Sequence, residues 1–375
     1  MYGNVRLVAA ALAISIAAVP SLLGQTRPRA RELGIQPGAG IPGPLNAITD
    51  VAGVKVGQVT VSIGDDVRTG VTGVLPHGGN LFRQKVPGAV FVGNGFGKLA
   101  GSTQIEELGT IESPIVLTNT LSVGTAVESL VRWTIAQPGN ENVRSVNVLV
   151  GETNDSRLSD IRGLHVTRDH VMSAISAAKE GPVEEGAVGA GTGTVAFGWK
   201  GGIGTASRSV TRDTDKWMVG VLVQSNYGGR LMIAGVPIWK ELPAPRQPDD
   251  PGADGSCMIV VATDAPLDAR DLERLAARAI FALARTGSTF SNGSGDYAIA
   301  FSTHPSLRVT NASAPQPRTL LPTESVSGLF EAVMDATEEA VYNSLLRATD
   351  TTGNGRTVRA LPIDELRQIL KKYSR

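Results

Sequence analysis

The chain has little of what metal sites and disulfide-stabilised folds require. It contains one cysteine, Cys257, so neither an intrachain disulfide nor a multi-cysteine zinc site can form. Of its four histidines, the two nearest in sequence are His165 and His170. They lack the i, i+4 spacing that places two ligands on one face of a helix. We therefore expect no bound metal.

An excess of charge of either sign is also missing. The 35 Lys and Arg residues balance 35 Asp and Glu residues, so the net charge is zero. Because a phosphate backbone is bound by a surplus of Lys and Arg, nucleic acid is not an expected partner. The glycine-rich segment Gly189–Gly193 lacks the G-x-G-x-x-G spacing of a dinucleotide-binding loop. We expect no organic cofactor.

The apolar run near the N-terminus is short. Leu7–Val19 covers 13 residues and is apolar except for Ser15. That length does not span ~30 Å of hydrocarbon but suits the core of a signal peptide, and Arg6 precedes it. Residues 1–25 are therefore predicted to be a signal peptide, with the protein periplasmic or secreted and without a stable membrane span after processing. An N-terminal membrane anchor is the alternative.

Short β-branched runs bounded by Gly, Pro or Asn alternate with helical patterns over the rest of the chain. The clearest helix begins after Asp268, an N-cap candidate, and Gly287 ends it. This alternation predicts an α/β or α+β fold with at least four helices. The predicted strands are Val54–Val61, Gly88–Val92, Ile115–Leu117, Val146–Val150, Met218–Gln224 and Ser256–Ala262, and the other predicted helices are Val123–Ile135, Arg168–Lys179 and about Ser325–Ala348.

One change of composition marks a candidate cleavage site. Glu241–Gly255 contains four prolines and four acidic residues and reads as a flexible, cleavable linker. Ser256 follows it directly and opens an apolar strand. A Gly-Ser bond in this place suits a self-cleaving nucleophile, because the freed α-amine of Ser256 can act as general base for its own hydroxyl. On these residues alone, an ordinary interdomain linker remains the alternative.

Motifs over roughly residues 36–345 resemble those of one family, in the same order. They are Gly40–Val51, Gly53–Gly57, Thr118–Gly124, Gly151–Asp155, Leu158 with Asp160 and Ile161, Gly189–Gly193, Lys200–Arg208, Val223–Gly228, Gly255–Cys257 and Asn292–Asp296. Together they resemble the DmpA-type aminopeptidases, the group of L-aminopeptidase/D-Ala-esterases and β-peptidyl aminopeptidases with an N-terminal nucleophile.

The resemblance implies the catalytic roles at the junction. Ser256 falls on the family's nucleophile, and the Gly255–Ser256 bond falls on its autoproteolysis site. Ser294 and Asp296 fall on the two residues that orient the nucleophile and its amine. Side chains two residues apart on an extended backbone point the same way, which suits that task.

Three further residues receive substrate-handling roles from the resemblance. Asn226 falls on the asparagine of the oxyanion hole, and an amide N–H is a sound donor to a developing alkoxide. Glu152 falls on the carboxylate that receives the free ammonium of the substrate. Asn154 stands where some members have a tyrosine near the oxyanion, so it departs from that pattern.

The resemblance also implies an architecture and an activity. The expected fold is a four-layer α/β/β/α sandwich, with residues 26–255 and 256–375 forming the two parts of one catalytic domain. The expected substrates are short peptides, amino-acid amides or esters, and processed αβ pairs would assemble as a homotetramer. Two alternatives are an acyltransferase of the ornithine acetyltransferase type, which would use threonine as nucleophile, and a non-enzymatic exported binding protein.

Overall fold

The computed structural model of the protein describes residues 27–245, 255–310 and 314–373. The predicted signal peptide and most of the predicted processing linker lie outside the described residues. Within the described ranges, no helix combines the length and the apolarity needed to cross a membrane.

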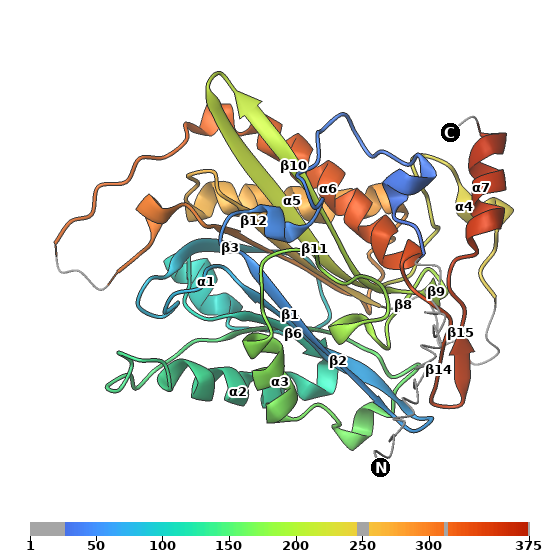
Figure 1. Ribbon diagram of the computed structural model, residues 1–375, viewed down its shortest axis with the longest axis horizontal. Helices are drawn as coiled ribbons and strands as arrows, with labels where there is room; N and C mark the ends of the chain where they lie inside the picture. The colour runs from blue at the N-terminus through green and yellow to red at the C-terminus, as the bar shows by residue number, and fades with distance from the viewer. Residues whose placement is uncertain (1–26, 246–254, 311–313, 374–375) are drawn as a thin grey trace, which may run out of the picture.

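Two β-sheets lie face to face at the centre of the molecule (Figure 1). The five-stranded sheet has the order β1 (Lys55–Ile63), β2 (Val67–Leu75), β6 (Ile115–Asn119), β7 (Leu149–Thr153), β4 (Leu99–Ala100). The six-stranded sheet has the order β10 (Gly202–Arg212), β11 (Asp215–Asn226), β12 (Ser256–Thr263), β13 (Gly295–Ser302), β3 (Val86–Gly95), β5 (Thr110–Ile111). Two small hairpins are β8 (Val195–Ala196) with β9 (Trp199–Lys200) and β14 (Thr351–Gly353) with β15 (Arg356–Val358).

Helices cover the outer face of each sheet. In Figure 1, α5 and α6 lie over the six-stranded sheet, and α2 and α3 lie under the five-stranded sheet. Three buried apolar clusters fill the spaces between these elements. The helices are α1 (Ser102–Leu108), α2 (Val123–Ile135), α3 (Arg168–Ser176), α4 (Ile238–Glu241), α5 (Ala269–Thr286), α6 (Ser327–Leu346) and α7 (Ile363–Lys372).

The predicted mixed α/β fold is confirmed, and several helix boundaries agree closely. The second helix, α2, has the predicted bounds. In α5, the Asp268 side chain accepts a hydrogen bond from the Asp271 N–H, and Gly287 ends the helix at φ 98°, a conformation that glycine adopts without strain. Local capping chemistry was therefore sufficient to place this helix.

Several predicted boundaries differ from those of the structure by up to three residues. The helix α3 ends at Ser176 rather than Lys179, because the backbone of Lys179 instead exchanges hydrogen bonds with Val56 at the start of β1. The strand β7 begins at Leu149 rather than Val146.

Three long strands of the central sheets, β2, β10 and β13, were not predicted at all. The glycine-rich strand β10 lacks a clear strand pattern, since glycine weakens a strand. A Cβ on Gly204 would lie 1.9 Å from the carbonyl oxygen of Ala340, so α6 packs directly against this backbone. Glycine here permits the close approach of a helix to the sheet.

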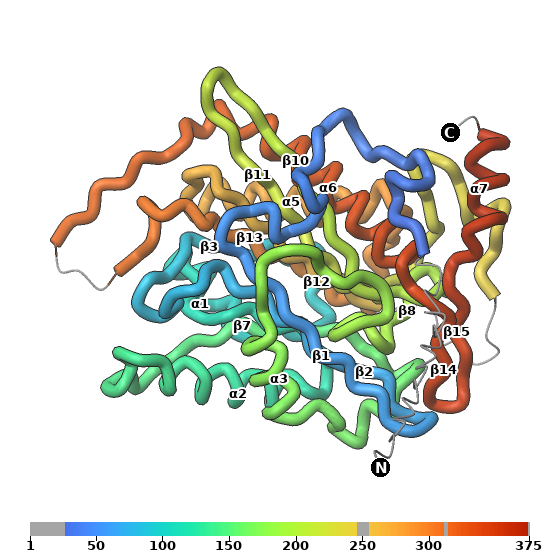
Figure 2. Tube along the Cα trace, viewed as in Figure 1, coloured from blue at the N-terminus to red at the C-terminus, as the bar shows by residue number. Residues whose placement is uncertain are grey.

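The first described segment of the chain is held against α6 (Figure 2). Arg31 pairs with the buried carboxylate of Glu339 at 3.0 Å, and Arg208 reaches the same carboxylate at 2.6 Å. The N-terminal segment is thereby tied to the helix layer above the six-stranded sheet.

The strand β12 lies inside the six-stranded sheet and is buried on both faces. Cys257, Ile259 and Val261 belong to the cluster under α5 and α6, whereas Met258 and Val260 belong to the cluster between the sheets. Because side chains alternate along a strand, Ser256 at its beginning shares the face of Met258. The strand therefore directs Ser256 toward the space between the two sheets.

Candidate active site

Ser256 opens β12 between two neighbouring strand ends. Its register partners are Asn226, the last residue of the antiparallel β11, and Gly295, the first residue of the parallel β13. The Gly295 N–H lies 3.0 Å from the Gly255 carbonyl oxygen and 3.3 Å from Ser256 Oγ. A single donor therefore holds both groups that would react in cleavage of the Gly255–Ser256 bond.

Gly255 is packed too tightly for any side chain. A Cβ at this position would lie 2.1 Å from the Asn226 carbonyl oxygen and 2.5 Å from Tyr227 Cα. Real Cβ contacts of that length do not occur, so the backbone of β11 requires glycine before Ser256. Close packing against Asn226 and Tyr227 therefore explains why glycine occupies position 255.

The Asn226 side chain is oriented by two backbone groups. Its Oδ1 accepts a hydrogen bond from the Val195 N–H at 2.9 Å, and its Nδ2 donates to the Asn154 carbonyl oxygen at 3.1 Å. Since a backbone N–H can only donate, the first contact identifies the oxygen end of the amide. One hydrogen of Nδ2 is left for a further acceptor, as an oxyanion donor requires.

Ser294 and Asp296 flank Ser256 on β13 and the loop before it. Both side chains are buried, and Ser294 Oγ and both carboxylate oxygens of Asp296 make no hydrogen bond of regular geometry with the described residues. Burial raises the pKa of Asp296 to about 6, although the nearby Ser294 hydroxyl and Cys257 N–H lower it. Ser294 and Asp296 thus form a buried polar pair without a regular hydrogen-bond partner. Such a pair destabilises the fold unless another group forms hydrogen bonds with it.

Glu152 supplies a second buried carboxylate. It lies on β7 with 2% of its surface exposed, and its Oε1 accepts the Lys98 N–H at 2.9 Å. Burial raises the pKa of Glu152, and the Lys98 ammonium, 3.8 Å away, lowers it. A Cβ on Gly97 would lie 3.1 Å from Glu152 Oε1 and 3.2 Å from Gly295 Cα, so this carboxylate lies near the start of β13.

Asn154 contributes to the site through its backbone. Its side chain is exposed and accepts the Ser156 N–H at 3.0 Å, while its carbonyl oxygen orients Asn226. A direct role of its side chain stays a prediction.

Lys200, Asp155 and Gly295 belong to the sequence motifs, but the motifs assign them no function. A charged residue inside a glycine-rich segment is the signal that could have singled out Lys200. The hydrogen bonds of Gly295 depend on strand pairing, which spacing does not reveal.

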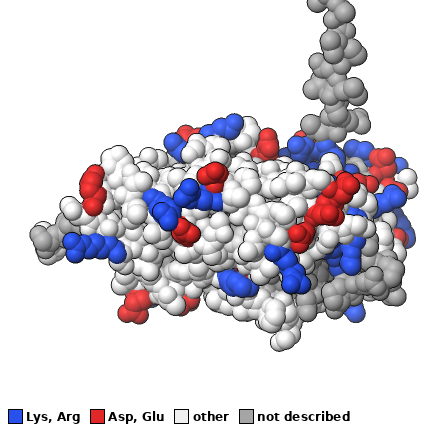
Figure 3. Space-filling view, turned by 90° about the horizontal axis from the view of Figure 1, so that it is seen from below, with Lys and Arg blue, Asp and Glu red and all other residues white. Residues whose placement is uncertain are grey.

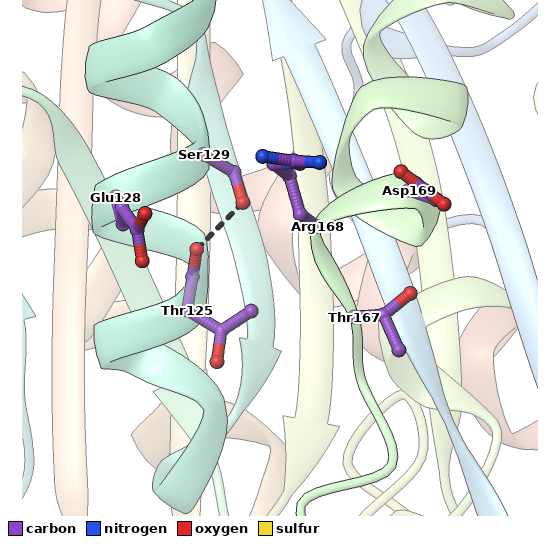
Figure 4. A pocket seen from close by; sticks show the side chains of 6 residues that line it. All are labelled: Thr125, Glu128, Ser129, Thr167, Arg168 and Asp169. Carbon is purple, nitrogen blue, oxygen red and sulfur yellow. Dashed lines mark hydrogen bonds between the residues drawn. The ribbon is translucent and has the colours of Figure 1, made fainter.

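Other polar features lie away from Ser256. A cavity of about 310 Å³ is lined by residues of α2 and of the start of α3, including Glu128 and Arg168 (Figure 4). It belongs to the helix layer outside the five-stranded sheet. On the face shown in Figure 3, acidic and basic side chains are scattered among uncharged ones.

The thiol of Cys257 is a core group. It is fully buried, and burial raises its pKa well above the ordinary value. The thiolate, which is the nucleophilic form, is disfavoured there. Among the described residues, no three His, Cys, Asp or Glu side chains are grouped to hold a metal ion.

Comparison with known proteins gives one consistent family. The sequence profile described as Peptidase family S58 matches residues 46–358. A β-peptidyl aminopeptidase, BapA, of Sphingosinicella microcystinivorans is 43% identical over 375 aligned positions, which cover 93% of each chain.

Two solved structures are similar throughout. A β-aminopeptidase of a Burkholderia species superposes with a TM-score of 0.85 at 40% identity, covering 92% of this chain and 98% of the other. The L-aminopeptidase D-Ala-esterase/amidase of Ochrobactrum anthropi, described as a variant of the Ntn hydrolase fold, superposes with a TM-score of 0.87 at 36% identity. It covers 93% of this chain and 99% of the other.

Proposed function

Because this chain belongs to peptidase family S58, we propose that it is a self-processing serine aminopeptidase whose nucleophile is Ser256. It is a hydrolase with aminopeptidase activity and the Ntn hydrolase fold. The non-enzymatic alternative is therefore set aside. The observation that carries the proposal is the contact of one donor, the Gly295 N–H, with both the Gly255 carbonyl and Ser256 Oγ.

Self-processing proceeds as an acyl shift followed by hydrolysis. Ser256 Oγ attacks the Gly255 carbonyl carbon, the C–N bond breaks, and the proton lost by the hydroxyl passes to the departing nitrogen. Water then hydrolyses the ester, leaving a Gly255 carboxylate and a Ser256 with a free α-amine. The Gly295 N–H already contacts the carbonyl oxygen that becomes the oxyanion, which supports this step.

The new α-amine gives Asp296 and Ser294 a partner. An ammonium has three donors, and three buried polar atoms of these residues make no regular hydrogen bond in the intact chain. We infer that the amine of Ser256, once released, is held by this pair. Its reference pKa of about 7.7–8.0 allows it to act as general base near neutral pH.

In turnover, the α-amine takes the proton of Ser256 Oγ as the oxygen attacks the substrate carbonyl. Asn226 Nδ2 donates its remaining hydrogen to the oxyanion, and Glu152 binds the free ammonium of the substrate. The leaving amine takes the proton from the Ser256 ammonium. Water activated by the same amine then hydrolyses the acyl-enzyme.

The substrates we propose are short peptides, amides or esters with a free N-terminal amine. The names of the relatives favour β-amino-acyl substrates together with L-α or D-α ones. A β-amino-acyl substrate has one more backbone carbon than an α-amino-acyl substrate. With its ammonium bound to Glu152, it can react only if its carbonyl carbon still reaches Ser256.

We also propose the finer architecture and setting. The order of α5 with α6, the six-stranded sheet, the five-stranded sheet and α2 with α3 supports a four-layer sandwich. The N-terminal apolar run supports export to the periplasm or beyond. Assembly of processed pairs as a homotetramer remains an inference from the family.

The test compares the parent protein with Ser256→Ala. Intact-mass analysis of the parent should show a fragment that begins at Ser256, and the protein should hydrolyse aminoacyl p-nitroanilides of L-Ala, D-Ala or β-homoalanine. Ser256→Ala should fold, stay uncut and be inactive. A single uncut chain in active parent protein would overturn self-processing, and an active Ser256→Ala variant would overturn the nucleophile.

A further inference from the structure

A lysine ammonium is buried beside the loop that orients Asn226. Lys200, at the end of β9, is fully buried, and its Nζ donates to the carbonyl oxygens of Gly191, Thr194 and Gly201 at 2.9, 2.9 and 2.8 Å. Three acceptors require three N–H donors, which only the protonated amine has. The geometry therefore specifies a buried cation that takes no part in the proposed catalytic steps.

The opposite charge comes from Asp155. This carboxylate is 2% exposed and lies near Thr69 and Asn119, and its charge favours the protonated form of Lys200. Burial acts against both charges, raising the pKa of Asp155 to about 7 and lowering the pKa of Lys200 to about 7. The charge of Asp155 thus favours the charged form of Lys200, while Thr69 and Asn119 also stabilise the Asp155 carboxylate.

The two charges flank the two backbone groups that hold Asn226. The Val195 N–H, which binds Asn226 Oδ1, follows Thr194, and the carbonyl of Thr194 accepts a hydrogen bond from Lys200. The Asn154 carbonyl, which binds Asn226 Nδ2, directly precedes Asp155. One contact of the amide is thus one residue away from Asp155, and the other is one residue away from a carbonyl that Lys200 binds.

We propose that Lys200, with Asp155, is a positioning pair that fixes the direction of the Asn226 amide, and this inference rests on the proposed oxyanion role of Asn226. Lys200 binds two carbonyls of the loop before β8, those of Gly191 and Thr194, and Asp155 lies in the loop after β7. A Cβ on Gly193 would lie 2.9 Å from Asp155 Cβ, so the two loops are in direct contact. If the loops separate, one or both contacts of Asn226 are lost, and the free hydrogen of Nδ2 no longer points in one direction.

The first test is Lys200→Met, which keeps the length of the side chain and removes the donors. Since a displacement of about 1 Å or the loss of one oxyanion donor costs ~10²-fold, we expect kcat to fall by about 10–100-fold. KM should stay within about threefold, because the binding of the substrate ammonium at Glu152 is untouched. Rates are expressed per processed chain, counted by the acyl-enzyme burst.

A double-mutant cycle separates positioning from general damage. In an Asn226→Ala background there is no amide to orient, so Lys200→Met should cost less than about threefold more. The matched control is Arg208→Met. Arg208 is also fully buried and also donates to carbonyl oxygens, those of Pro37 and Ser207, but it lies against α6. Arg208→Met should lower Tm and leave kcat per processed chain near the parent value.

A second variant covers a failure of Lys200→Met to fold. Asp155→Asn keeps the shape of the side chain and removes the counter-charge, and it should lower kcat in the same direction, again without effect when Asn226 is alanine. If Asn226→Ala itself stops self-cleavage, the rate of processing replaces kcat as the readout in every arm.

Three results would overturn the positioning role: a parent-like kcat in Lys200→Met, losses that multiply fully with Asn226→Ala, or neither pair variant folding. The first two would place the pair outside the site, and the third would make it a requirement for folding. A parent-like kcat in Asn226→Ala alone would instead refute the proposed oxyanion donor, and an active Ser256→Ala would refute the proposed function.

Discussion

Ser256 and Asn226 are direct register partners at the adjoining ends of two antiparallel strands, β12 and β11. The partnership places the proposed nucleophile and the proposed amide donor on neighbouring backbones inside the sheet, where neither can move without disturbing the ladder. Both are nearly buried, at 5% and 6% exposure. A substrate carbonyl brought to Ser256 Oγ would therefore meet a donor that is already in position.

Replacement of Glu152 should impair recognition of the substrate amine. Glu152→Gln keeps the shape and removes the charge, and a charge-assisted hydrogen bond is worth ~1.5–3 kcal/mol, so kcat/KM on free-amine substrates should fall by about 10–150-fold. Self-cleavage needs no incoming ammonium and should proceed normally. Glu107→Gln, on an exposed position of α1, is the control and should have parent kinetics. Normal hydrolysis by a processed Glu152→Gln variant would remove Glu152 as the anchor.

Alanine at position 255 should slow processing. Its Cβ would lie 2.1 Å from the Asn226 carbonyl oxygen, so the chain must shift away from β11 and from the Gly295 N–H. Time-resolved intact mass would measure the rate of cleavage, which we expect to fall at least tenfold if roughly 1.4 kcal/mol of alignment is lost. Gly124→Ala in α2, where a Cβ meets nothing within 4 Å, should process at the parent rate. Equal rates in both variants would contradict the steric argument.

The uncut chain should carry a pH signature of Asp296. Its pKa is about 6 in the fold and 3.8 as a free group, so the native state binds more protons than the unfolded state between these values. The contribution of Asp296 to stability should then fall as pH rises from about 4 to 6, by up to ~3 kcal/mol.

Urea unfolding of Ser256→Ala with and without Asp296→Asn would measure this signature. The difference between the two free energies of unfolding should change over that pH range and level off above it. A constant difference would show that Asp296 is not an unpaired buried carboxylate in the precursor.

Cys257 should be dispensable for catalysis. Its thiol is buried under α5 and its pKa is raised well above the ordinary value, so it should not react with a thiol reagent in the native protein and should react fully in denaturant. Cys257→Ala should retain kcat and lose about 1 kcal/mol of stability from the smaller side chain. Loss of turnover in a folded, processed Cys257→Ala variant would make the thiol a participant.

The candidate cleavage junction and the clearest helix could be predicted from the sequence because their signals are local. The proline-rich, acidic stretch before Gly255, the apolar run after Ser256 and the cap of α5 at Asp268 each follow from a few neighbouring residues. The order of the motifs also indicated the family. Such features need no partner from another part of the chain, so spacing and composition are enough to find them.

The rest depends on contacts between residues distant in sequence. Composition gave no reason for glycines in β10, because the reason is the backbone of α6 pressed against Gly204. The family resemblance could propose Asn226 as a donor but not the Val195 N–H and Asn154 carbonyl that orient its amide. The buried charges of Lys200 and Asp155 can be interpreted only once the two loops are known to lie together. A charge inside a protein persists only where another group compensates for its lost hydration.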